Sequence, residues 1–195
     1  MGTLAQAKTY GGIGSVLLLV GPFVPLAGIV VSIIGFVLAL VAVKYISDTV
    51  GDRAIYSNML YFVIFAIIGS VVAFLFVFAA FLPFAGTGIP TGGFDLTDPA
   101  TILAATTVLI GLGIAWVFTI IAALFLRRSF EGISNRLGVG LFGTAGLLYF
   151  IGAILVIVIV GFLLILIAVI LMIVAFFSIP DQPPAPMVAQ PPPAS

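Results

Sequence analysis

The chain has 195 residues, of which 64% are hydrophobic and 6% are charged, and its six basic and six acidic side chains give a net charge of zero. So few charged groups cannot form the polar shell of a soluble domain, and their balance excludes a basic nucleic-acid surface. Cysteine and histidine are absent, which excludes disulfides, thiolate nucleophiles, imidazole catalysis and the usual ligands of haem, zinc, copper and iron–sulfur centres.

The first uncharged stretch covers residues 9–43. As one helix it would be about 52 Å long, which exceeds the ~30 Å hydrocarbon core of a bilayer. Pro22 and Pro25 interrupt it, because proline removes a helix donor and favours a turn. The pattern therefore predicts one span over residues 3–20 and a second over 25–46.

The segment from Lys44 to Arg53 is a compact polar connection. Ser47, Asp48 and Asp52 are residue types that cap helices, so we interpret this segment as a solvated turn with a cap. The alternative interpretation is a binding cluster formed by Lys44, Asp48, Asp52 and Arg53.

The third span is predicted over 56–82 and the fourth over 100–126, joined by a loop rich in glycine and proline. Asp98 followed by Pro99 is typical of a helix N-cap with proline at the first helical position. Asp95 and Asp98 could instead hold a cation weakly, although capping already occupies Asp98.

The longest uncharged stretch is 137–180, which as one helix would be about 66 Å long and must also turn back. We expect a fifth span over 139–159 and a sixth over 162–179, with Gly161 marking the turn. Residues 183–195 include six prolines and no charge, which predicts a disordered cytoplasmic tail, with a PxxP-type ligand as the alternative.

These elements predict an all-α integral membrane protein, in which residues 1–182 form six transmembrane helices arranged as two helical hairpins flanking a central helix pair. With this count all basic residues fall on one face, and the opposite loops carry only acidic ones. The positive-inside rule then predicts a multi-pass protein of the cell membrane with both termini in the cytoplasm. The six basic residues are Lys8, Lys44, Arg53, Arg127, Arg128 and Arg136.

An internal repeat is a further hypothesis. The sequence YGGIG at 10–14 resembles FGTAG at 142–146, and Gly28 and Ala42 match Gly161 and Ala175 at a separation of 133 residues. Chance similarity between two apolar stretches is the alternative interpretation.

Four stretches carry a likeness to a known family: AKTYGGIGS at 7–15, AVKYISD at 42–48, FGTAGLLY at 142–149 and VAFFSIP at 174–180. In these stretches, and over nearly the whole chain except the outer loop and the tail, the protein resembles the DUF996 family. The members are multi-pass membrane proteins, mostly archaeal, without an assigned activity. The resemblance therefore implies the membrane topology and an archaeal-type host, and it supplies no catalytic residue.

No charged residue is expected in the cores of the spans, where such groups usually mark ion or proton paths. The hydroxyls there are expected to bond to carbonyls one turn back, and small residues four positions apart predict close helix packing, within the chain or with a partner. The small-residue pairs are Gly28 and Ser32, Gly35 and Ala39, Gly69 and Ala73, and Gly111 and Ala115.

Phosphate-binding loops, paired intramembrane carboxylates and nucleophile–base sets are missing from the sequence. We therefore expect no enzyme, no catalytic, cofactor or metal site, and no cofactor. The expected partners are the lipid bilayer and other membrane-protein subunits or a second copy, contacted through small-residue helix faces. The predicted function is that of a non-catalytic structural, assembly or accessory subunit. The alternative is a channel or facilitator for a neutral or hydrophobic solute, lined by the hydroxyls of Ser32, Thr106, Thr107 and Thr119.

Overall fold

A computed structural model describes residues 3–85, 95 and 97–180 of the chain. This part is all-helical, as predicted, with no strand among the described residues. The predicted tail and most of the outer loop lie outside the described residues. The elements are α1 (Leu4–Val20), η1 (Gly21–Phe23), α2 (Gly28–Val50), α3 (Arg53–Ala80), η2 (Leu82–Phe84), α4 (Pro99–Leu137), α5 (Gly140–Ile154) and α6 (Ile159–Phe177), where η denotes a short 3-10 helix.

Local chemistry explains several of the helix ends. Thr3 forms a capping box with Gln6 at the start of α1, and the Asp52 side chain accepts a hydrogen bond from the Ala54 backbone N–H at the start of α3. The helices α2 and α4 end at Gly51 and Gly138, whose φ angles are 69° and 71°. Side chains other than glycine rarely adopt this left-handed conformation, so these glycines stop the helices at defined positions.

The predicted cap of the fourth helix is confirmed. Asp98 is the N-cap residue of α4, its side chain accepts a hydrogen bond from the Thr101 backbone N–H, and a proline stands at the first helical position. Proline is well tolerated there because its missing N–H would have no partner within the helix.

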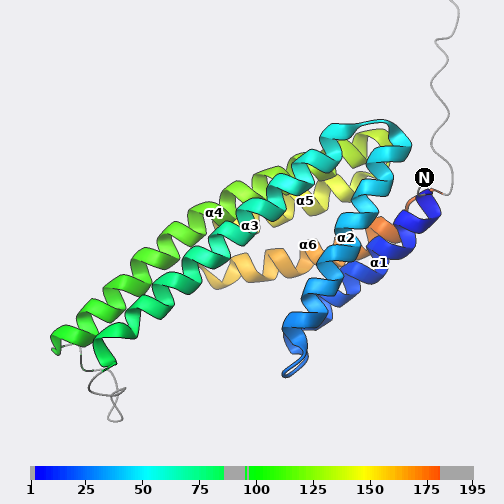
Figure 1. Cartoon of the computed structure of the whole chain (residues 1–195). Coiled ribbons are helices and arrows are strands. Elements are labelled where there is room, and N and C mark those ends of the chain that lie inside the picture. The colour runs from blue at the N-terminus through cyan, green and yellow to red at the C-terminus, as the bar shows by residue number, and fades with distance from the viewer. Residues whose placement is uncertain (1–2, 86–94, 96, 181–195) are drawn as a thin grey trace, which may run out of the picture.

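Helices that are adjacent in sequence pack along one another, α1 with α2, α3 with α4 and α5 with α6, while α4 also packs against α5 and α1 against α6. Figure 1 shows α3 and α4 as a long pair whose far end projects beyond the other helices. The α1–α2 pair diverges from α3 and α4 toward that same end (Figure 1). The distance between the two pairs therefore increases away from the chain's N-terminal end.

The core lies at the end where these helices converge. Three fully buried phenylalanines join α4, α5 and α6: the Phe130 and Phe142 ring centroids are 5.5 Å apart and those of Phe142 and Phe176 are 5.0 Å apart, both edge to face. The buried Ile46 of α2 and Leu4 of α1 belong to the same cluster. All six helices thus contribute to or pack against one core at this end.

Two connections differ from the sequence-based expectation. The helix α4 continues past the expected span end at residue 126 and runs to Leu137, so the charged segment after the apolar part is helical. The last turn occupies residues 155–158 rather than the region of Gly161. Gly161 lies inside α6, where a Cβ atom would collide with the Leu155 carbonyl group, so this glycine permits the close return of the chain.

Four of the described helical segments are long and apolar enough to cross a membrane: Gly28–Val50, Arg53–Phe84, Pro99–Leu137 and Ile159–Phe177. The remaining two helices, α1 with 17 residues and α5 with 15, are shorter than the ~20 residues that a perpendicular crossing needs.

Candidate functional site

The polar segment between α2 and α3 is a capped turn. Asp52 caps α3, and the Ser47 hydroxyl donates to the Asp52 carbonyl oxygen at 2.8 Å. Lys44, Asp48 and Arg53 are exposed, and none of them has an ion pair among the described residues. The structure therefore supports the turn and cap over the binding cluster that was the alternative interpretation.

Asp52 has a partner that the sequence did not reveal. The Arg136 side chain at the end of α4 donates to the same Asp52 carboxylate oxygen, with Nη2 at 3.0 Å and Nε at 3.1 Å. This contact joins two connections 84 residues apart. The Arg136 side chain is about half exposed to solvent, so this ion pair contributes little to the stability of the fold.

Two more arginines lie against aromatic rings at this end. The Arg127 guanidinium lies 5.7 Å from the centre of the Phe150 ring, and that of Arg128 lies 5.8 Å from the centre of the Phe125 ring. The face of an aromatic ring attracts the guanidinium cation of arginine. The apolar part of the side chain can then lie on apolar surface while its charged end stays in water. This arrangement is suited to the edge of a membrane.

Two of the four hydroxyl groups proposed as a solute path are used within their own helices. Thr107 Oγ1 donates to the Leu103 carbonyl at 2.7 Å, and Thr119 Oγ1 donates to the Ala115 carbonyl at 2.9 Å. Similar bonds one turn back are made by Ser15, Ser70 and Thr144. No side-chain hydrogen bond of Ser32 or Thr106 is present in the described part.

The four candidate hydroxyls do not share a cavity. Ser32 lines a cavity of about 890 Å³, and Thr119 lines a separate one of about 260 Å³ that also contains Ser70 and Tyr149. A further apolar cavity of about 520 Å³ lies between α3 and α4 around Thr101. None of these cavities is lined by more than one of the four predicted path residues, and Thr106 and Thr107 line none of them.

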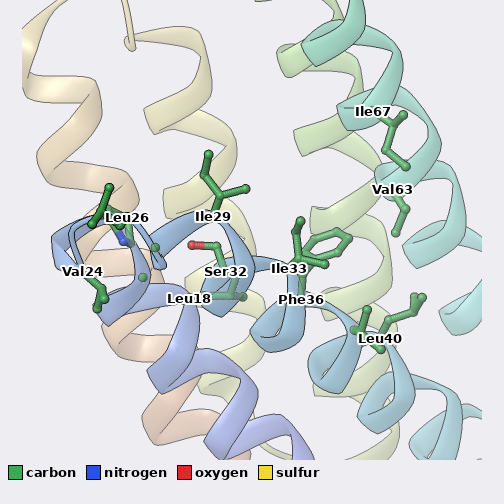
Figure 2. Close-up of a pocket in the computed structure, with 14 residues that line it drawn as sticks. Leu18, Val24, Leu26, Ile29, Ser32, Ile33, Phe36, Leu40, Val63 and Ile67 are labelled. Atoms are coloured by element: carbon green, nitrogen blue, oxygen red, sulfur yellow. The ribbon is translucent and has the colours of Figure 1, made fainter.

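The largest of these cavities lies between α2 and α3, next to the turn at 21–28, and we call it the α2–α3 cleft. In Figure 2, Ile29, Ile33 and Phe36 of α2 form one wall, and Val63 and Ile67 of α3 stand opposite them. The rings of Phe36 and Phe62, 5.7 Å apart, join α2 to α3 beside the cleft. Sequence periodicity could not reveal the cleft, because it arises from the angle between two helices.

The small residues that were expected to form contact faces are used inside the chain. A Cβ atom on Gly35 would lie 2.7 Å from the Gly14 carbonyl oxygen, and one on Gly69 would lie 3.0 Å from Phe118 Cβ. A Cβ atom on Gly111 would collide with the Phe76 side chain. These glycines bring α1 close to α2 and α3 close to α4, and so they do not provide a free face for a partner.

The two outer carboxylates are occupied by local hydrogen bonds. Asp95 Oδ1 accepts from the Thr97 backbone N–H at 2.8 Å and from its hydroxyl at 2.7 Å, and these bonds lower the pKa of Asp95. Asp98 Oδ2 accepts from the backbone N–H and the hydroxyl of Thr101. No group of three potential metal ligands occurs among the described residues.

The lengths and apolar surfaces of the long helices are those of α-helical membrane proteins. The chain belongs to the DUF996 family, described as a protein family of unknown function, whose model matches residues 31–170. It is 38% identical over 178 residues to an uncharacterized protein of Methanocaldococcus jannaschii, MJ1644, covering 91% of this chain and 94% of that protein. No solved structure matches the chain significantly. The family resemblance drawn from the sequence is confirmed.

Proposed function

We propose that the protein crosses the cell membrane six times, with both termini in the cytoplasm. The helix ends that carry the six basic residues gather at one end of the molecule, and Asp95 and Asp98 belong to the opposite end (Figure 1). This separation of charge supports the orientation given by the positive-inside rule. The short helices α1 and α5 pack against the longer helices α2 and α4.

Within that membrane the protein acts as a non-catalytic structural, assembly or accessory subunit of a membrane complex. One observation carries this proposal: several hydroxyls inside the helices donate to carbonyls of their own helix, as Thr107 and Thr119 do. A hydroxyl bonded in this way offers no vacant donor to a passing solute or a reaction. What the helices offer instead is a large apolar surface for binding other molecules in the membrane.

The same observation weighs against a path for polar solutes along the hydroxyls. A facilitator for hydrophobic solutes is the second candidate, and the volume of the α2–α3 cleft, about 890 Å³, favours it. Such a solute would need no hydroxyl path, because the lining of the cleft is apolar except for Ser32.

The test is to purify the tagged protein from its native membrane in mild detergent and to determine its mass by size-exclusion chromatography with light scattering. We expect a complex containing a second membrane protein, or a second copy of this chain, in a constant ratio. Purified protein is then reconstituted in vesicles, and glycerol flux is compared with that of Thr119→Val, which removes a hydroxyl with little change in volume. A lone monomer whose vesicles conduct glycerol, with flux altered by Thr119→Val, would contradict the subunit proposal.

A further inference from the structure

The α2–α3 cleft opens to the surroundings of the molecule along its side. Its wall residues Ile29, Ile33 and Ile67 are 77%, 58% and 57% exposed, although all of them are large and apolar. The cleft extends from the turn at 21–28 along α2 as far as Leu40. The cleft thus begins at the end of the molecule opposite the basic residues, and its inner end lies beside the contact between Phe36 and Phe62.

Water does not suit this space. A buried water molecule needs two to four polar partners, and Ser32 is the one polar side chain on the lining. Within the proposed membrane orientation, the medium outside the cleft is hydrocarbon. An open apolar cavity at that depth is filled by hydrocarbon, either as the chain of a lipid or as the side of a partner helix.

The shape of the walls favours a lipid chain. Membrane helices approach each other over small residues, since these let the backbones come close. The walls here are formed by isoleucine, valine, leucine and phenylalanine. The two glycines of the lining are already used: a Cβ atom on Gly28 would collide with the Gly21 carbonyl, and one on Gly21 would collide with the Ser32 hydroxyl. A thin, flexible hydrocarbon chain can lie between such branched side chains without the close backbone contact that a partner helix makes over small residues.

The cleft also has a polarity gradient. Ser32 stands one turn into α2, and Figure 2 shows its hydroxyl pointing toward the turn that carries Leu26. No polar side chain lines the cleft deeper than Ser32. A lipid enters such a site with its chain pointing inward and its polar linkage near Ser32 and the turn.

We propose that the α2–α3 cleft binds the hydrocarbon chain of a lipid from the outer leaflet, held by Ile33 and Phe36 of α2 and by Val63 and Ile67 of α3. The site retains one lipid in place of the freely exchanging lipids around the other helices. This inference rests on the proposed membrane location, and it does not depend on the subunit role.

The experiment uses the full chain in phosphatidylcholine vesicles that contain a trace of phosphatidylcholine with a photoactivatable diazirine on one chain. After illumination, labelled residues are mapped by mass spectrometry. We expect labelling of α2 and α3 residues in the cleft to exceed that of Phe74 and Ile110, which are 68% and 53% exposed and lie outside the cleft. A diazirine at the chain end should label Val63 and Leu40, and one near the polar linkage should label Ile29.

Two matched pairs of variants test the site itself. Ile67→Trp and Val37→Phe fill the cleft and should remove the excess labelling, whereas Ile64→Trp and Ile34→Phe, on the same helices but outside the lining, should retain it. Folding of each variant is checked by size-exclusion chromatography in detergent, and either pair suffices if one filling variant does not fold.

The possible results separate the proposals. Equal labelling inside and outside the cleft, or excess labelling that persists in both filling variants, overturns the lipid site. Crosslinks from cleft residues to another protein in native membranes also overturn it, in favour of a partner helix. Absence of labelling at Phe74 and Ile110 as well as in the cleft would overturn the membrane location on which the inference rests.

Discussion

Ser129 of α4 is fully buried, and its hydroxyl donates a hydrogen bond to the Ile55 carbonyl oxygen of α3 at 2.8 Å. Several other hydroxyls in the long helices bond to carbonyls of their own helix, whereas this one joins residues 74 positions apart. Gly132, one turn later in α4, lies against the Ile55 side chain. Ile55 is therefore the point at which α4 is fixed to the start of α3.

Replacing Ser129 by alanine should lower the free energy of unfolding by about 0.5–1.5 kcal/mol, the usual net contribution of one hydrogen bond. Ser57→Ala is the matched control, since the Ser57 hydroxyl makes only a local, exposed bond to the Ala54 carbonyl. Thermal unfolding of both variants in the same detergent measures the difference. Equal midpoints for the two variants would show that the bond between α3 and α4 contributes nothing.

At the scale of the elements, close approach over glycine determines how the helices pair. Gly14 and Gly35 face each other across α1 and α2, so that a Cβ atom on either would lie 2.6–2.7 Å from the carbonyl oxygen of the other. Gly28 and Gly161, which the repeat hypothesis aligns, both lie at the start of the second helix of a pair and against a carbonyl group at the end of the first. This common role supports the repeat, which stays a prediction.

Two Gly→Ala substitutions should have opposite effects. Gly35→Ala inserts a methyl group into a backbone contact and should destabilise the protein by about 1–3 kcal/mol, as overpacking does. Gly113→Ala on α4 meets nothing within 4 Å and should stabilise the helix by up to about 1 kcal/mol. Unfolding midpoints in detergent provide the comparison, and a stabilised Gly35→Ala would refute the close contact of α1 and α2.

At the scale of the whole molecule, charge separates the two ends. The described polar groups of one end include all six basic residues, partly balanced by Asp48, Asp52 and Glu131, whereas the other end has Asp95 and Asp98. The helices converge on a buried core at the basic end and diverge at the acidic end (Figure 1). The α2–α3 cleft opens within this divergence.

Single cysteines test the orientation, since the native chain has none. Thr97→Cys, exposed before α4, should react with a membrane-impermeant maleimide added to intact cells. Asn135→Cys, exposed near the end of α4, should react only after the cells are opened. The reverse pattern would invert the topology, and reaction of both in intact cells would refute the six-span count.

The sequence by itself determined the helical fold, the family and several helix ends. These follow from composition and from local chemistry, as at Asp98 with Pro99, where the cap is formed by neighbours in the chain. The use of most hydroxyls within their own helix was also predictable, because the acceptor is one turn away. The position of the turn at 155–158 was missed because a single glycine marked the return. Gly161 lies inside α6, where the lack of a side chain makes room for the Leu155 carbonyl group of that turn.

Only the tertiary structure decided which helix faces meet. The small residues at Gly35, Gly69 and Gly111 predicted close packing, but whether their neighbour is this chain or a partner depends on contacts between distant segments. The ion pair of Asp52 with Arg136 and the hydrogen bond from Ser129 to Ile55 also depend on contacts between distant segments. The α2–α3 cleft depends on the divergence of two helix pairs, which no local pattern encodes. Sequence periodicity specifies which residues share a helix face, but it does not specify the crossing angle between that helix and its neighbour.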